Sequence, residues 1–214
     1  MDKKTAGKMF DILSKEYPEV TTALRHKNPL ELLVATILSA QCTDKRVNIV
    51  TESLFKKYKT AKDYAGADIS RFEQEIRSTG FYKNKAKNIK GAAKMIVEDF
   101  KGKVPQTMEE LVRLPGVARK TANIVLYHAF GKNIGIAVDT HVKRVSFRLG
   151  LTKNTDPVKI EADLMKIFDR SKWGVLSNLL IEHGRKVCDA RKPLCAACKL
   201  SKICPSAKLF IRTD

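Results

Sequence analysis

Four of the five cysteines in the 214-residue chain lie close together near its end. Their spacing is C-x6-C-x2-C-x5-C, formed by Cys188, Cys195, Cys198 and Cys204. Four thiolates on one short loop can hold either an iron–sulfur cluster or a tetrahedral zinc ion, and the residue types alone do not choose between them. A disulfide framework is disfavoured, because it would spread its cysteines over a smaller secreted chain. Cys42 stands in an apolar stretch, and we expect it to be a small buried residue.

A short turn at 114–118, with the sequence Leu-Pro-Gly-Val-Ala, separates two segments of helical character. Pro115 ends the first helix, and Gly116 permits a backbone angle that other residues resist. Backbone N–H groups at the start of the next helix then point outward together and can bind a phosphate. A plain corner between two helices would suit the same residues, so the spacing leaves both interpretations open.

Lys120 follows this turn, in the first turn of the predicted helix. The positive end of the helix dipole and the neighbouring Arg119 both disfavour a protonated amine there. A neutral amine is a nucleophile that can attack the anomeric carbon of a sugar and form a Schiff base. The alternative is a solvated lysine, or one that contacts a phosphate.

Asp139 precedes another predicted helix, at 140–149, and is a natural N-cap. The helix terminus keeps such a carboxylate ionised. It can then stabilise positive charge on a sugar or move protons for an amine. Capping and catalysis are compatible, so Asp139 can do both.

The net charge indicates the partner. The chain has 41 Lys and Arg against 23 Asp and Glu, a formal charge of +18, which attracts polyanions such as nucleic acid. A surface that only promotes solubility is the alternative. The best apolar run, at 30–40, is too short to span a membrane, and the N-terminus lacks the apolar stretch of a secretory signal. We therefore expect a cytoplasmic protein.

Four segments resemble motifs of the endonuclease III family, a group of helix–hairpin–helix DNA glycosylases and AP lyases, and they occur in the family's order. Residues 114–126 (LPGVARKTANIVL) resemble its hairpin signature, and 138–142 (VDTHV) its aspartate loop. Residues 38–44 (LSAQCTD) and 78–82 (STGFY) resemble its two DNA-inserting loops. The resemblance covers nearly the whole chain. It implies a nucleoid-associated, monomeric base-excision repair enzyme that acts on duplex DNA with oxidised pyrimidines or abasic sites.

The resemblance also implies roles for single residues. Lys120 displaces the damaged base, and the Schiff base then allows β-elimination of the 3′ phosphate, while Asp139 stabilises charge on the sugar. Because the target base is flipped out of the duplex, Gln41 fills the hole it leaves. Phe81 acts as a wedge where the family often has leucine, and a core contact remains the alternative. Further DNA contacts are expected from Leu114, Gly116, Ala118, Arg191 and Lys192.

Three details qualify this picture. The cysteine spacing resembles the family's cluster loop, which favours a [4Fe–4S] cluster over zinc. Ala118 stands where the family commonly has a second glycine; alanine would fit a helical conformation there but not a positive φ. His141 fits the aspartate loop as a supporting residue, whereas the other histidines are expected to be structural or at the surface: His26, His128 and His183.

The segments that carry these residues are all predicted to be helices. Apolar residues recur with a helical period, and no run alternates apolar and polar residues as a strand would. Capping residues and glycines mark the boundaries of predicted helices at 30–40, 69–76, 83–100, 107–114, 119–130, 140–149, 157–168 and 173–187. Asn28 with Pro29 in the first turn and Asp68 are predicted caps of the first two, and residues 107–110 (TMEE) form a predicted capping box. We expect an all-α fold of about ten helices in two lobes. Residues 22–132 would form a six-helix barrel domain with the helix–hairpin–helix, and residues 1–21 and 133–214 an iron–sulfur cluster domain. The active cleft would lie between them.

Three rival functions remain. An adenine mismatch glycosylase shares the hairpin and cluster but lacks a lysine at this motif position and usually has an additional C-terminal domain. A thymine mismatch glycosylase is disfavoured by the same lysine. A non-catalytic DNA-binding or redox module would use the hairpin only as an anchor.

Overall fold

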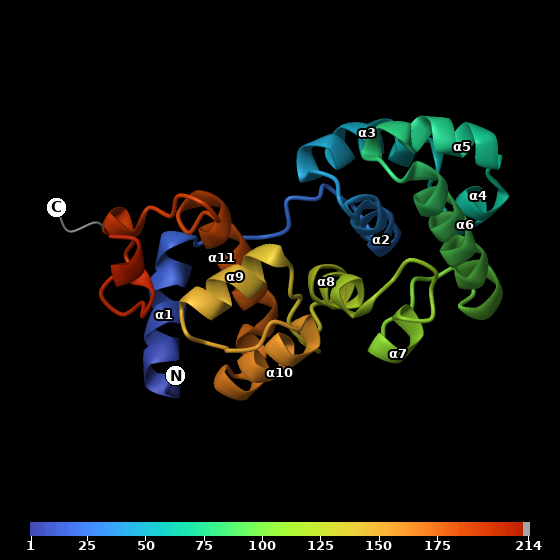
Figure 1. Cartoon of the computed structure of the whole chain (residues 1–214). Coiled ribbons are helices and arrows are strands. Elements are labelled where there is room, and N and C mark those ends of the chain that lie inside the picture. Colours follow the sequence, from blue (N-terminus) through green and yellow to red (C-terminus); the bar gives the residue numbers. More distant parts are fainter. Residues whose placement is uncertain (212–214) are drawn as a thin grey trace. The chain divides into compact units, whose positions relative to one another are not determined.

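Helices make up all the regular structure of residues 1–211, the part of the chain that the computed structural model describes (Figure 1). This confirms the all-α prediction. The α-helices are α1 (Lys3–Glu16), α2 (Pro29–Leu38), α3 (Asp44–Lys57), α4 (Ala61–Gly66), α5 (Ile69–Ile76), α6 (Tyr82–Asp99), α7 (Met108–Leu111), α8 (Arg119–Phe130), α9 (Thr140–Arg148), α10 (Pro157–Ile167) and α11 (Trp173–Lys186). Four 3-10 turns complete the set: η1 (Arg77–Thr79), η2 (Arg170–Lys172), η3 (Cys195–Ala197) and η4 (Ala207–Leu209). Within these residues, no helix combines the length and apolar character that crossing a membrane requires.

The chain folds into two compact units. The first, here called the hairpin unit, is Thr22–Lys132. The second, the cysteine unit, joins Met1–Thr21 to the residues from Asn133 onward. The hairpin unit contains α2 to α6 and α8, with α7 as a single additional turn, and the cysteine unit contains α1 and α9 to α11.

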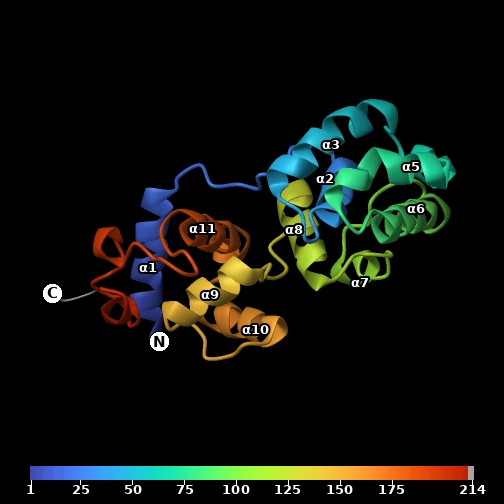
Figure 2. The same cartoon turned by 45° about the horizontal axis from the view of Figure 1, so that its top comes forward.

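Helix α2 is the centre of the hairpin unit. Every residue from Leu32 to Leu38 is buried, because α2 packs against α3, α6 and α8 (Figure 2). A helix that is apolar all round is typical of a buried core element. Asn28 caps it through a bond from the Glu31 N–H, with Pro29 in the first turn, as predicted. It ends at Leu38, two residues earlier than predicted, which releases the segment before α3 as a loop.

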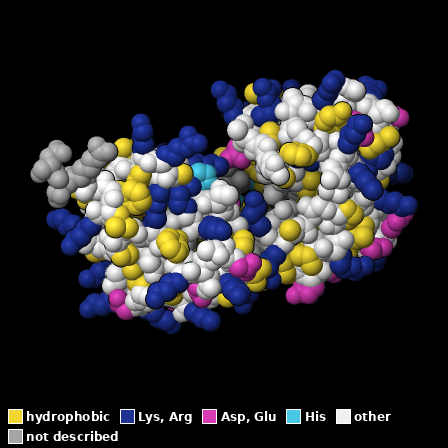
Figure 3. Space-filling view, viewed as in Figure 1, with side chains coloured by type: hydrophobic (Ala, Val, Ile, Leu, Met, Phe, Trp, Pro, Cys, Tyr) yellow, Lys and Arg dark blue, Asp and Glu magenta, His cyan; other side chains and the backbone are white. Residues whose placement is uncertain are grey.

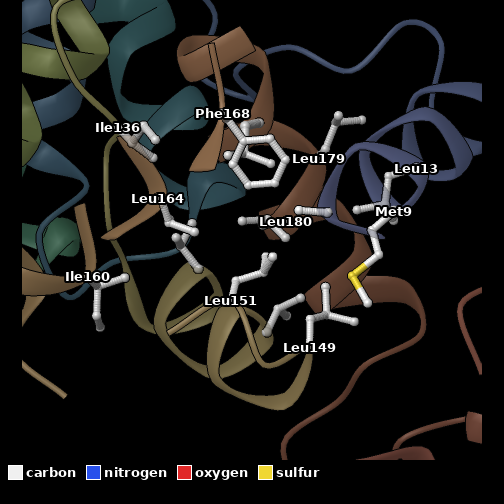
Figure 4. Packing of buried hydrophobic residues seen from close by; sticks show 14 of the residues in the cluster. Met9, Leu13, Ile136, Leu149, Leu151, Ile160, Leu164, Phe168, Leu179 and Leu180 are labelled. Atoms are coloured by element: carbon white, nitrogen blue, oxygen red, sulfur yellow. The ribbon is translucent and has the colours of Figure 1, made fainter. Parts of the chain in front are cut away.

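The core of the cysteine unit needs both ends of the chain. Met9 and Leu13 from α1 pack with Leu149 and Leu180 from the C-terminal half (Figure 4). Burying each such side chain contributes about 1.5–3 kcal/mol. Three of the four clustered cysteines pack against the edge of this core: Cys188, Cys198 and Cys204. The apolar core of this unit therefore supports the cysteine loop directly.

Helix α7 differs from its prediction. It ends at Leu111, three residues before the expected boundary. Thr107 caps it, but the Glu110 carboxylate accepts from the Thr107 hydroxyl instead of from its backbone N–H, so the predicted capping box does not close. Tight turns follow, in which the Leu114 N–H donates to the Leu111 carbonyl. The shorter helix leaves residues 112–118 free to form the hairpin.

Candidate active site and cysteine loop

The hairpin between α7 and α8 depends on Gly116. Its φ is +78°, in the left-handed region that glycine adopts without strain. A Cβ atom at this position would lie 2.8 Å from the Cβ of Asn88 on α6, which is too close. Both the backbone angle and the packing therefore require glycine, as the sequence predicted for the turn.

The other two predicted hairpin contacts have different environments. Leu114 is 2% exposed; its N–H donates to Leu111 and its carbonyl accepts from Val117 at 3.0 Å. Leu114 thus shapes the turn from inside. Ala118 is exposed and extended, with φ −90° and ψ 170°, as the N-cap of α8. This conformation is neither helical nor left-handed, so alanine in place of a second glycine causes no strain.

Helix α8 begins without a side-chain cap. Its N-cap residue, Ala118, makes no side-chain cap hydrogen bond, and the N-terminus of a helix can bind an anion. Lys120 is the second residue of the helix and is exposed. Within residues 1–211 it takes part in no ion pair, so its amine is accessible to solvent.

Asp139 begins α9 as its N-cap. Its Oδ1 accepts the Val142 N–H at 2.8 Å, which confirms the capping role, and the residue is half-buried. The preceding segment is fixed from two sides: the Ser177 hydroxyl of α11 donates to the Ala137 carbonyl at 2.6 Å, and Glu161 of α10 accepts the Ile136 N–H at 3.1 Å. The carboxylate is therefore held on a rigid support.

His141 is linked to the same support. Its Nδ1 lies 3.1 Å from Nη2 of Arg144, whose guanidinium also donates to the carbonyls of Gly184 and Cys188. This arrangement ties the first turn of α9 to the end of α11. It agrees with a supporting role for His141.

The two loops that were predicted to insert into DNA share an uncommon backbone conformation. Gln41 has φ +52° and Phe81 has φ +48°, and both side chains are exposed. Non-glycine residues in this region are uncommon and often occur at functional sites. Phe81 is 66% exposed, so the alternative of a core contact is wrong.

Two residues near these loops have environments that the sequence did not indicate. Cys42 is half-buried, not buried as predicted, because it follows the exposed Gln41 on the loop surface. Lys85, on α6, is 4% exposed, and its Nζ donates to the carbonyls of Leu38 and Thr79 at 2.7 and 2.8 Å. Lys85 could not be singled out from the sequence because the segment contains several other lysines.

All four clustered cysteines line one small cavity in the cysteine unit. Arg148 donates to Sγ of Cys188 at 3.4 Å, and the Leu200 N–H donates to Sγ of Cys198 at 3.4 Å. Donors aimed at sulfur suit anionic thiolates. In residues 1–211, no three His, Cys, Asp or Glu side chains meet closely enough to hold one metal ion.

Burial controls protonation around this cavity. It raises the pKa of the Cys198 and Cys204 thiols above the ordinary value. It also lowers the pKa of His183 to about 4, so this imidazole is neutral at physiological pH. His183 Nε2 lies 3.7 Å from Sγ of Cys198, and its Nδ1 lies 3.2 Å from the Tyr17 hydroxyl. His183 is structural, as predicted, but it belongs to the cysteine constellation, which its sequence position did not show.

The basic residues of the cysteine loop are not equivalent. Arg191 and Lys192 are exposed, and their backbone N–H groups donate to Oδ1 of Asp189 at 2.8 and 3.0 Å, which fixes the turn beneath them. Lys199 forms an ion pair with Glu16 of α1 and so contributes less free positive charge. Figure 3 shows many Lys and Arg side chains and few Asp and Glu on the visible face of the molecule.

Comparisons with known proteins give a consistent result. Residues 34–170 match the family model of the HhH-GPD superfamily of base excision DNA repair proteins. The chain is 58% identical over 206 residues to endonuclease III from Synechocystis, covering 96% of this chain and 94% of that protein. It matches a non-covalent endonuclease III–DNA complex with a TM-score of 0.95 and 43% identity, covering 100% of both chains. A trapped covalent endonuclease III–DNA intermediate matches with a TM-score of 0.94 and 43% identity, covering 99% of this chain and 100% of that one.

Proposed function

The chain belongs to the endonuclease III family of the HhH-GPD base excision DNA repair superfamily, and we propose that Lys120 and Asp139 carry out its chemistry on duplex DNA. It is a bifunctional enzyme, a glycosylase that removes a damaged base and an AP lyase that cleaves the strand. The observation that carries the residue assignment is the exposed Lys120 amine in the first turn of an uncapped helix, next to the glycine hairpin.

Lys120 supplies the nucleophile. Its neutral amine attacks C1′ of the damaged nucleotide, and the bond from C1′ to the base breaks, so that the base leaves with a proton. The nitrogen gives up one proton to the leaving base. The C1′–O4′ bond then breaks, O4′ takes a proton from solvent, and an iminium that keeps the remaining N–H proton forms between Nζ and C1′. Removal of a C2′ proton then expels the 3′ phosphate, and water releases the sugar from the lysine. No oxidant or reductant is needed.

Asp139 supplies a fixed negative charge. One carboxylate oxygen holds the start of α9, and the other is available to stabilise the positive charge that develops on the sugar as the base leaves. It can also take up or return a proton of the amine.

DNA binding is assigned to three surfaces. The hairpin at Gly116 and Ala118 presents the N-terminus of α8 to a backbone phosphate, while Leu114 supports the turn from below. Gln41 and Phe81 enter the duplex from their loops: Gln41 fills the hole left by the flipped-out base, and Phe81 acts as a wedge. Arg191 and Lys192 contact phosphates from the cysteine loop.

A [4Fe–4S] cluster is proposed for the cysteine cavity. All four thiols line it, and the guanidinium of Arg148 and the N–H of Leu200 are already directed at two of the sulfur atoms. When bound, the cluster cross-links the end of α11 to the C-terminal loop and so holds Arg191 and Lys192 in place. Purified protein should be yellow-brown and contain iron. A colourless protein that contains zinc would contradict this assignment.

Borohydride trapping tests the proposed chemistry. The enzyme is mixed with an abasic duplex and borohydride, which reduces the iminium and leaves the protein covalently attached to DNA. Wild type and Lys143→Ala, an exposed lysine on α9, should trap equally, and Lys120→Ala should not trap but should still bind DNA. Absence of trapping in the wild type would favour a monofunctional mismatch glycosylase or a binding module. Equal loss of trapping and binding in Lys120→Ala would make the residue structural.

The finer assignments need separate measurements. A panel of defined duplexes should show preference for oxidised pyrimidines over mismatched adenine or thymine. Light scattering after size exclusion should give the mass of a monomer. Imaging of tagged protein should place it in the cytoplasm with the nucleoid.

A further inference from the structure

Lys85 is a buried cation with a specific pair of partners. Its Nζ donates to Leu38, the last residue of α2, and to Thr79, the last residue of η1. Helix ends leave carbonyls without intrahelical partners, and a single ammonium satisfies one at each end. Lys85 therefore links two points that are 41 residues apart in sequence, since 79 − 38 = 41.

The arrangement is costly for stability alone. Removing an ammonium from water costs several kcal/mol, and burial lowers the pKa of Lys85 for the same reason. Within residues 1–211 no carboxylate forms an ion pair with it. A neutral donor could satisfy the same two carbonyls without burying a charge. The position of the two carbonyls points to what the lysine contributes instead.

Both carbonyls lie at the base of a predicted inserting loop. Leu38 is three residues before Gln41, and Thr79 is two residues before Phe81. Both Gln41 and Phe81 have left-handed backbones, so each loop is a sharply defined turn that projects an exposed side chain. A rigid tie between the two loop bases fixes the distance between the two projecting side chains.

We propose that Lys85 is a positioning residue that couples the two inserting loops, so that Gln41 and Phe81 enter the duplex as one preformed pair. The inference rests on the proposed DNA-inserting role of these loops. Lys85 touches neither substrate nor the reacting atoms; it acts through the loop backbones. Flipping the damaged nucleotide out removes its stacking on the base pairs above and below. If both side chains enter together, they compensate for this lost stacking in a single step, which favours extrusion of the nucleotide.

The same helix provides a matched control. Lys90 also donates its Nζ to two backbone carbonyls, those of Ala65 and Ala67, but these lie at the C-terminal end of α4 and belong to no inserting loop. Lys90→Met therefore removes a comparable lysine-to-carbonyl link from α6 without touching the loops. Lys87→Met removes an exposed charge from α6 and controls for electrostatic attraction to DNA.

The test compares substrates that do and do not require insertion. Lys85→Met, Lys90→Met, Lys87→Met and wild type are assayed on an oxidised pyrimidine in a duplex and on an abasic site in single-stranded DNA. A fluorescent 2-aminopurine next to the lesion reports unstacking. Lys85→Met should lose at least 10-fold in rate and most of the fluorescence rise on the duplex, while borohydride trapping on single strands stays within 2-fold of wild type. The two control variants should lose less than 3-fold on the duplex.

Equal losses on duplex and single strands in Lys85→Met, or losses as large in Lys90→Met, would make Lys85 only a fold-stabilising residue and overturn the proposal. If Lys85→Met does not fold, a double-mutant cycle of Gln41→Ala and Phe81→Ala in the otherwise unchanged chain decides. If the loops are coupled, the effect of the double variant on unstacking differs from the sum of the two single effects. If it equals that sum, the proposal is overturned. Failure of the wild type to trap abasic DNA would instead remove the proposed function itself.

Discussion

The starts of α8 and α9 use the same structural position in opposite ways. Ala118 and Asp139 are both extended N-cap residues, with φ −90° and −104°. Asp139 closes its helix with a carboxylate, whereas Ala118 offers no side-chain acceptor and is followed by two basic residues, Arg119 and Lys120. Negative charge stabilises a helix N-terminus and positive charge destabilises it. The start of α9 is thus held rigidly, whereas α8 lacks a stabilising cap and leaves the Lys120 amine open to a substrate.

Of the substitutions at these two helix starts, replacement of Lys120 should have the largest effect on activity. Lys120→Ala removes the nucleophile, and we expect kcat for strand cleavage to fall by about 10³-fold or more, as loss of the nucleophile does in other covalent enzymes. Stability should change by less than about 0.5 kcal/mol, since the side chain is exposed. Single-turnover kinetics and thermal unfolding measure the two effects. A large loss of stability would contradict the view that α8 is open at this point.

Asp139 allows charge and capping to be separated. Asn is as good an N-cap as Asp, so Asp139→Asn should leave stability nearly unchanged but slow base removal by about 10²-fold, the usual range for a single electrostatic group. Asp139→Ala should show the same kinetic loss and also lower the free energy of unfolding by about 1 kcal/mol. If Asp139→Asn retains full activity, the carboxylate is only a cap.

A substitution at Gly116 tests whether the hairpin before α8 requires glycine. Gly116→Ala puts a Cβ at positive φ and 2.8 Å from Asn88, and we expect a loss of about 2–3 kcal/mol in the free energy of unfolding, together with weaker DNA binding. Gly131→Ala is the control, because Gly131 also has positive φ, at +65°, but open space around it. It should cost only about 1 kcal/mol. Equal losses would show that the contact with Asn88 is unimportant.

The smallest effect is expected from giving α8 the cap that α9 already has. Ala118 has the backbone angles of an N-cap, so Ala118→Ser should stabilise the protein by about 0.5–1 kcal/mol. The new hydroxyl would compete with phosphate for the first-turn N–H groups, and DNA affinity should fall a few-fold. Chemical denaturation and binding titrations measure the two changes. Greater stability with unchanged affinity would show that these N–H groups do not hold phosphate.

Several features could be predicted from sequence because they depend on few neighbouring residues. Caps at Asn28, Asp68 and Asp139 each bond to a backbone N–H three residues on, and all three form as predicted. The cysteine set likewise lies on a short segment, and its members line one cavity. The predicted C-terminal boundary of α7 was wrong, because the residues after Leu111 form tight turns in place of a further helical turn. The local sequence pattern does not distinguish these two conformations.

Other features depended on contacts between distant segments. The exposed Phe81, the neutral His183 beside Cys198 and the ion pair that occupies Lys199 follow from packing across the fold. The helical class, the hairpin turn and the candidate reactive groups can be inferred from the sequence, because they follow from periodicity and local bonding. The burial of Lys85 between two loop bases is visible only in the folded chain, because it depends on which distant carbonyls reach the amine.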